Sequence, residues 1–248
     1  WDENKVYVVE SEDGKKVPVP FGFVPSTIDG EKAVETGFVI KEGEDGSLTE
    51  GINEFVWVPV PDINKMYGID SKGKKWGKSY EFSSSGVTND NWNESNGFIT
   101  ILSQNDCREP DIVPKTETDS SLPGYRVGAT TQAGFKTQME LEFEEMLTSV
   151  EKYSGFYIGR YETGNLSQAK PVVQKNNTDI SNQTWYTMYN KCKLITTGVN
   201  NSVKTTMIWG SQWDACLLWM YNSKNLETKK YVYDSTGRGF YDGGYQEF

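Results

Sequence analysis

Short apolar runs separated by turn residues dominate the first sixty residues, a pattern typical of β-strands. Residues 17–23 (VPVPFGF) carry two prolines, which favours an edge segment over a central strand. The dipeptides Asp13-Gly14 and Asp45-Gly46 favour turns. Three runs rich in β-branched and aromatic residues predict strands: 5–9 (KVYVV), 37–41 (GFVIK) and 54–60 (EFVWVPV).

Residues 62–134 have a different character. Only 97–102 (GFITIL) is typical of a strand, and its flanks are rich in Ser, Asn, Asp, Lys, Thr and Pro. Long stretches without regular periodicity are usually functional loops or disordered inserts. We therefore expect one domain over 1–248 with three parts: N-terminal strands and hairpins (1–61), a loop-rich insert (62–134) and a helix-strand-helix core (135–248).

Helical periodicity appears in the last part. A helix is predicted to begin at Thr137, because Glu140 three residues later completes a capping-box pattern. A second helix is predicted over 184–195, where apolar residues recur at helical spacing. A third is predicted to begin at Ser211, with Asp214 as its acidic partner. Between the first two, 155–162 (GFYIGRYE) predicts a strand and 171–174 (PVVQ) a short extended piece.

The order of these segments resembles the formylglycine-generating enzyme (sulfatase-modifying factor) family. The strand GFYIGRYE is similar to its F-Y-I-x-x-Y-E strand, and the helix from Trp185 to Cys192 to its Trp-led helix ending in Cys. The segment 212–215 (QWDA) is similar to its E-A-E-W-E-Y-A helix, and 55–59 (FVWVP) to its first core strand. The resemblance implies an α+β, C-type-lectin-like fold, with a small twisted sheet, two to three helices and long irregular loops.

The same resemblance has departures that bear on function. The family's G-N-V-W-E-W, R-G-G-S and closing G-F-R motifs are missing from the sequence, and with them its copper-binding cysteine pair. We expect the C-terminal half of the family fold to lie outside this sequence or to have been lost. The resemblance also implies a bacterial surface protein, held by an anchor outside the segment.

Composition excludes several classes of chemistry. The chain has no His, so a His-assisted triad or a His-ligated zinc or iron site is excluded. The net charge of −10 argues against a wide nucleic-acid surface. No apolar run approaches the roughly 18 residues of a membrane span. Sparse Cys and abundant Asn, Ser, Thr and Gly favour an extracellular or cell-surface protein.

The three cysteines are interpreted as structural. Cys192 and Cys216 fall on apolar faces of predicted helices, where free Cys behaves as a small hydrophobe. Cys107 lies in a polar stretch beside Arg108 and is the best candidate for a reactive thiol, although no His and no neighbouring Cys accompany it.

Oxygen-bearing side chains gather around Trp92. Asp90, Asn91 and Glu94 are weak calcium candidates, because Ca²⁺ prefers carboxylate and amide oxygens. Their spacing lacks the glycine and terminal Glu of an EF-hand, so a solvated loop is favoured and no cofactor is predicted beyond a possible calcium ion. An acid pair for glycoside hydrolysis would have to come from Glu142, Glu144, Glu145 or Glu162, the first three of which a solvated helix face explains more simply.

Aromatic residues in loop-like contexts are the best binding candidates. Rigid aromatic rings stack on sugars or pack into partner surfaces; the other interpretation is packing of long loops onto the core. No catalytic residue is assigned. The expected function is a non-catalytic, surface-exposed binding or display module for a glycan or a protein. The alternative is an oxidoreductase of the formylglycine-generating type whose active site lies in the missing C-terminal part; a glycan-acting enzyme ranks third. The ligand-binding candidates are Trp76, Trp92, Tyr241 and Tyr245.

Overall fold

The computed structural model shows a mixed α+β chain and describes residues 2–69, 73, 75–77, 80–82, 99–101, 132–165, 169–177 and 185–222. It separates into two compact units. Unit 1 comprises 1–59, 126–128 and 149–207, and unit 2 comprises 60–125, 129–148 and 208–248. Whether the chain forms the single domain expected from the sequence stays a prediction.

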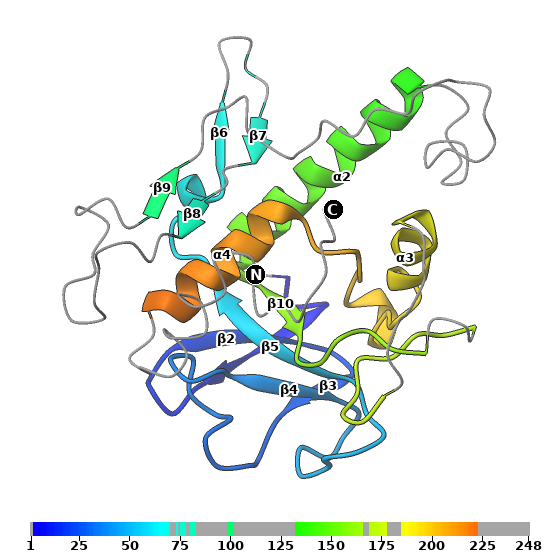
Figure 1. The fold of residues 1–248 in the computed structure, drawn as a ribbon. Helices are drawn as coiled ribbons and strands as arrows, with labels where there is room; N and C mark the ends of the chain where they lie inside the picture. The colour runs from blue at the N-terminus through cyan, green and yellow to red at the C-terminus, as the bar shows by residue number, and fades with distance from the viewer. Residues whose placement is uncertain are drawn as a thin grey trace. The chain divides into compact units, whose positions relative to one another are not determined.

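Unit 1 is built on a four-stranded antiparallel sheet in the order β10-β5-β4-β3 (Figure 1). Its strands are β3 (Phe23–Pro25), β4 (Val39–Glu42), β5 (Glu54–Pro59) and β10 (Gly155–Gly159). The predicted strands at 37–41, 54–60 and 155–162 are thereby confirmed, although the last ends at Gly159.

A separate hairpin opens unit 1. Strands β1 (Val6–Glu10) and β2 (Lys16–Pro20) pair antiparallel, and the predicted turn at Asp13-Gly14 lies between them, with Gly14 at φ +73°. Among the described strands β2 pairs with β1 alone. An edge position suits Pro18 and Pro20, which lack the N–H that a second partner would require.

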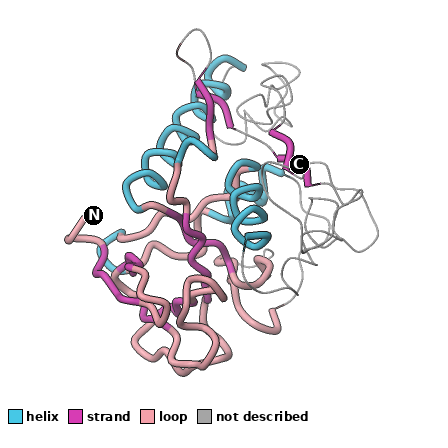
Figure 2. Tube along the Cα trace, turned by 90° about the vertical axis from the view of Figure 1, so that its left-hand side faces the viewer, coloured by secondary structure: helices cyan, strands magenta, loops and turns pink. Residues whose placement is uncertain are grey.

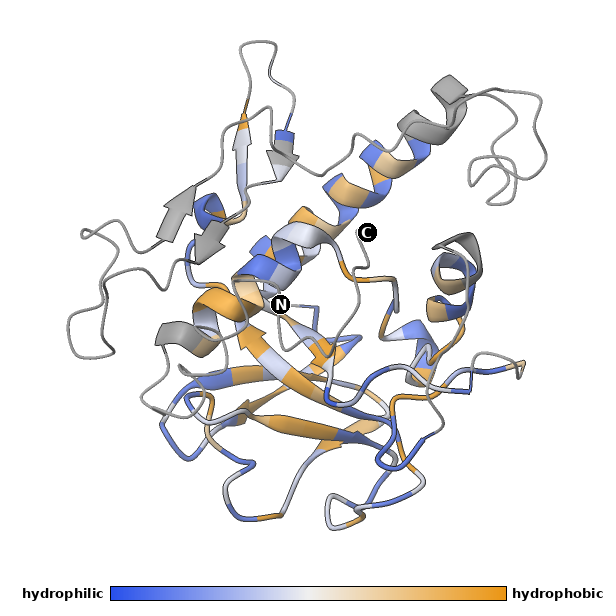
Figure 3. Ribbon diagram, in the orientation of Figure 1, coloured by the Kyte–Doolittle hydropathy of each residue, from blue (hydrophilic) through white to orange (hydrophobic). Residues whose placement is uncertain are grey.

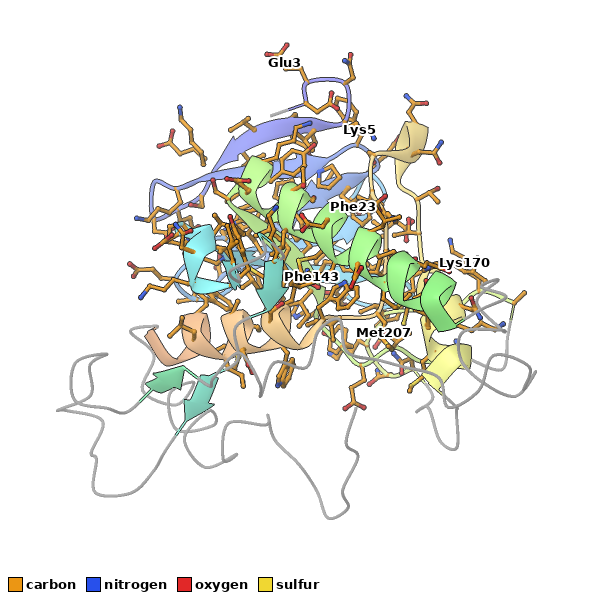
Figure 4. All side chains as sticks on the ribbon, turned by 90° about the horizontal axis from the view of Figure 1, so that it is seen from above. Glu3, Lys5, Phe23, Phe143, Lys170 and Met207 are labelled. Carbon is orange, nitrogen blue, oxygen red and sulfur yellow. The ribbon has the colours of Figure 1, made fainter. Side chains whose placement is uncertain are left out.

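The core of unit 1 is a cluster of buried apolar side chains contributed by the hairpin, the sheet and later segments. Aromatic rings lie within it: Phe23 and Phe55 meet edge-on at 5.7 Å, and Trp57 lies 4.9 Å from Tyr157. Figure 4 shows Phe23 among other side chains and Glu3 at the periphery, and Figure 3 shows β4 and β5 as largely hydrophobic strands. The cluster comprises Val17, Val19, Phe23, Val34, Phe38, Ile40, Phe55, Trp57, Val173 and Ile195.

Where α2 ends, the backbone must approach the sheet closely. Helix α2 (Gln132–Tyr153) stops at Ser154, which has φ +62°, the left-handed conformation common just after a helix. The next residue, Gly155, begins β10. A Cβ there would lie 2.4 Å from a ring carbon of Trp57 and 2.5 Å from the carbonyl of Val58, so only glycine fits.

Later segments of unit 1 are hydrogen-bonded to the residues around this sheet. Helix α3 (Trp185–Cys192) confirms the core of the predicted 184–195 helix, and a 3₁₀ turn, η4 (Val199–Asn201), follows. Val199 donates a backbone hydrogen bond of 3.0 Å to Phe21, and Ser202 Oγ donates one of 2.7 Å to the same carbonyl. The predicted piece at 171–174 is present as an isolated bridge between Gly164 and Val172.

Unit 2 holds the larger part of α2, up to Thr148, together with α4 (Gly210–Asn222). Phe143 of α2 meets Trp209 edge-on at 5.4 Å. The other buried apolar residues of this unit include Met66, Met139, Leu147, Ala215, Cys216 and Leu217.

Short strands in unit 2 correct the expectation for 62–134. That stretch contains the predicted strand at Ile99–Ile101 (β9), but also a 3₁₀ turn and three further strands. Each is three residues long, too short to show a two-residue alternation. The additional elements are η1 (Ile63–Lys65), β6 (Tyr67–Ile69), β7 (Lys75–Gly77) and β8 (Tyr80–Phe82), and the pairs formed are β6–β7 and β8–β9.

Both capping-box predictions are wrong. Helix α2 begins at Gln132, five residues before Thr137, so Thr137 lies inside the helix and not at its N-cap. Helix α4 begins at Gly210, so Ser211 already lies inside its first turn. The side chain of Gln212 accepts a 3.2 Å hydrogen bond from the Trp209 N–H, the reach-back half of a capping box.

Candidate functional site

Charged side chains converge at one end of the four-stranded sheet. Lys41 on β4 stands opposite Glu54 on β5 in the strand register, so both side chains share one face. Arg160 follows β10 directly, and its N–H donates 3.0 Å to the Glu54 carbonyl, which carries the pairing one residue past the strand. Glu31 comes from the connection between β3 and β4. We call Glu31, Lys41, Glu54 and Arg160 the ionic cluster.

The guanidinium of Arg160 bridges the two carboxylates. Its Nη2 lies 2.6 Å from Glu31 Oε1, and its Nη1 lies 2.7 Å from Glu54 Oε2. Charge-assisted pairs of this length are among the stronger hydrogen bonds in proteins. Because the planar fork of Arg fixes both carboxylates at once, it joins the β3–β4 connection to β5 and β10.

The other polar atoms of the cluster are also engaged. The hydroxyl of Ser26 donates to Glu31 Oε2, and Lys41 Nζ lies 3.8 Å from the same oxygen. Lys41 Nζ also donates to the Leu48 carbonyl. The lysine side chain is 0% exposed and that of Glu54 is 2% exposed, so two of the four charges have no access to solvent.

Proton affinities in the cluster follow from this pairing. Partial burial opposes ionisation of Glu31, but hydrogen bonds from Ser26 and Arg160 and the two nearby cations hold its pKa below the ordinary value. Burial likewise opposes the charge of Arg160, yet Glu31 and Glu54 raise its pKa further. Burial raises the pKa of the adjacent Tyr161 phenol, whose ring lies 5.6 Å from the Arg160 guanidinium carbon. The pairing therefore favours the ionised carboxylate of Glu31 and the charged guanidinium of Arg160 at neutral pH.

A second polar network lies where β4 and β5 meet the later segments. Glu42 accepts hydrogen bonds from Asn53, at 2.6 Å, and from Thr196. Asn53 in turn accepts 2.8 Å from the backbone N–H of Val173. These bonds fix the 171–174 and 195–203 segments to the sheet and leave the carboxylate of Glu42 with two donors.

The sequence did not single out the ionic cluster. Arg160 and Glu54 lie 106 residues apart, and no periodicity links them. One available signal was the charged residue at the border of each apolar strand run: Glu54 before FVWVP, and Arg160 after GFYIG. Glu162, weighed earlier as an acid, is exposed, and its carbonyl accepts a hydrogen bond from Asn177.

The cysteines that the structure describes pack as predicted. Cys216 is buried on α4, and Cys192 packs against the core cluster of unit 1. Burial raises the pKa of Cys192 to about 11 and that of Cys216 to about 12. Both thiols therefore stay protonated at neutral pH and are poor nucleophiles. Cys107 lies outside the described residues.

The predicted ligand-binding residues are only partly covered. Trp76 lies on β7, opposite Gly68 of β6 in the hairpin register. The remaining binding and calcium candidates lie outside the described residues: Trp92, Tyr241, Tyr245, Asp90, Asn91 and Glu94. Of the helical acids, Glu144 forms a 2.7 Å ion pair with Lys75. Within the described part of the chain, no three Cys, Asp or Glu side chains gather closely enough to hold a metal ion.

Comparisons with protein-family models, with curated proteins and with solved structures return no match for this chain. Over the described residues, the structure contains no helix of the length and apolarity that would cross a bilayer.

Proposed function

We propose that this chain is a non-catalytic binding or display module of the cell surface or extracellular space, built on a C-type-lectin-like scaffold, with a glycan or a protein as its ligand. The observation that carries the proposal is the ionic cluster, whose buried charges pair with one another. An acid or base that performs catalysis needs a free proton site facing a substrate. In Glu31, Glu54 and Arg160 the opposing charges instead hold three chain segments together.

The described thiols support the same proposal. Nucleophilic and metal-binding cysteines need a lowered pKa, whereas burial raises the pKa of Cys192 and of Cys216. What unit 1 offers is a rigid sheet with long connections, such as the pink loops below the strands in Figure 2. On scaffolds of this kind, binding function resides in the loops. The C-type-lectin-like scaffold in this proposal is inferred from the resemblance of the sequences of β5, β10, α3 and α4 to segments of the formylglycine-generating enzyme family.

A glycan array probed with the whole chain tests the proposal, with a parallel panel of purified extracellular proteins. Replacing Trp92 or Trp76 by Ala should abolish or strongly weaken the signal, because stacked aromatic rings dominate sugar recognition. Tyr67→Ala is the matched control: Tyr67 lies on the same β6–β7 hairpin, opposite Gly77, and we expect binding to persist. Absence of binding on both panels would contradict the proposal, as would oxidation of a cysteine-containing peptide by the chain itself.

A further inference from the structure

We propose that Glu31 and Lys41 form an acid-sensitive latch: proton uptake by Glu31 leaves a buried ammonium at Lys41 without its compensating charge, and residues 26–31 then detach from the sheet to let water reach it. This conformational device is independent of the ligand proposed above. It rests on the geometry of the ionic cluster in unit 1.

The two cations of the cluster differ in their access to water. The side chain of Arg160 is 29% exposed, so its guanidinium can turn to solvent if Glu31 is neutralised, while it keeps Glu54 as a partner. The side chain of Lys41 is 0% exposed, so its ammonium cannot turn to solvent in the same way. An ammonium buried without a partner is strongly unfavourable, so the protein around it opens or the charge is lost.

The charged groups around Lys41 show why Glu31 is decisive. Arg160 pairs with both carboxylates, but among the described acids Glu31 is the one within ion-pair distance of the Lys41 ammonium, with Oε2 at 3.8 Å. Asp45 in the β4–β5 connection also interacts with Lys41, but its carboxylate is exposed and therefore screened by solvent. The Tyr161 phenol interacts with Arg160, Glu54 and Glu31, and its raised pKa keeps it neutral in acid.

The segment that would detach is held by exposed contacts of Asp29 with Lys32 and of Gly30 with Thr36, and by the bonds of three further residues. Ser26 is attached through its N–H to the Val39 carbonyl at 2.9 Å and through its hydroxyl to Glu31. Thr27 donates 3.1 Å to Gly46, and the Glu31 carbonyl accepts 2.9 Å from Val39. Protonation of Glu31 weakens its charge-assisted contacts with Ser26, Lys41 and Arg160 together. Residues 26–31 are thus the part of unit 1 that this one titration releases.

The pH range follows from the sign of the shift. Partial burial opposes the charge of Glu31, but Ser26, Arg160 and Lys41 outweigh it and lower its pKa. Because the folded-state pKa lies below the unfolded one, the latch is fully closed at neutral pH. It opens only as the pH falls through the lowered folded-state value.

Hydrogen exchange followed by mass spectrometry on the full chain tests the latch, with rates expressed as protection factors. Glu31→Gln imitates the protonated carboxyl, so the protection of residues 26–31 should fall roughly hundredfold at neutral pH, somewhat less than for a fully buried ion pair because Glu31 is 13% exposed. Glu44→Gln, at an exposed acid in the β4–β5 connection, is the matched control and should leave protection unchanged.

The decisive variant is the double substitution Glu31→Gln with Lys41→Met. Removing the buried charge should restore the protection of residues 26–31 and make it insensitive to acid, because an apolar side chain of similar size fits where the ion pair stood. The latch is disproved if Glu31→Gln keeps full protection, or if Lys41→Met fails to restore it. Equal loss of protection in β5 and β10 of the single variant would also overturn it, because the opening would then be global.

Discussion

The two faces of the four-stranded sheet in unit 1 differ in the interactions that stabilise them. One face carries Ile40, Phe55 and Trp57 into the apolar cluster that the β1–β2 hairpin helps to form. The other face also buries Val39 and Val58, but at its end it carries Lys41 and Glu54, which Arg160 and Glu31 complete. Apolar burial is non-directional and insensitive to pH, whereas an ion network depends on geometry and on protonation. The stability contributed by the first face should therefore be insensitive to pH, whereas the contribution of the ionic cluster on the second face depends on protonation.

The largest effect is expected on the apolar face. Trp57→Ala should lower the free energy of unfolding by about 4 kcal/mol, because it removes a buried indole that packs against Tyr157 and Gly155. Urea denaturation followed by circular dichroism measures this loss. Val8→Ala is the control, since Val8 is 49% exposed and should change stability by less than about 0.5 kcal/mol. A loss as small for Trp57→Ala would show that the apolar face is not the main support of unit 1.

The charged face should give an intermediate effect. Arg160→Met should lower the free energy of unfolding by about 2 kcal/mol, because it leaves Glu31 and Glu54 without their bridge. The figure lies below that for a fully buried pair because Arg160 is 29% exposed and partly screened. Adding Glu31→Gln should cost less than the sum of the two single losses, since both substitutions remove the Arg160–Glu31 contact. Strictly additive losses in the double variant would mean that the two side chains do not act as one network.

The smallest effect is expected at Asp13, whose carboxylate accepts a hydrogen bond from the backbone of the core residue Val34. Burial opposes ionisation of Asp13, but hydrogen bonds from Ser11 and from the N–H groups of Val34 and Glu35 lower its pKa. Asp13→Asn should cost about 1 kcal/mol or less, because the carboxylate is only partly buried and the Asn side chain keeps one acceptor oxygen.

The pH dependence of this contribution has a definite sign. Because the folded-state pKa of Asp13 is lowered, its stabilisation is present above the unfolded value and is lost as the pH falls through the folded one. Unfolding curves of the wild type and Asp13→Asn should therefore converge in acid. A gap that stays constant, or widens, would contradict this assignment.

The strands of unit 1 were predictable because each is a short run of β-branched and aromatic residues, as in β4 and β5. The start of α2 was not, because the Thr137-to-Glu140 pattern of a cap also arises inside a helix. The three-residue strands β6, β7 and β8 are too short to show a period. The ionic cluster could not be predicted from the sequence for a different reason. Glu31, Lys41 and Arg160 are brought together only by the register of β4, β5 and β10.

One pairing has a consequence for how the chain tolerates change. Pro59 at the end of β5 stands opposite Gly155 at the start of β10, so the polypeptide leaves the sheet and returns to it at directly paired positions. The entropy of closing such an excursion grows only with the logarithm of its length. Changes in the length of the intervening chain should therefore alter the closure entropy of this pairing only slightly, as long as they keep Tyr153, which packs against the core of unit 1.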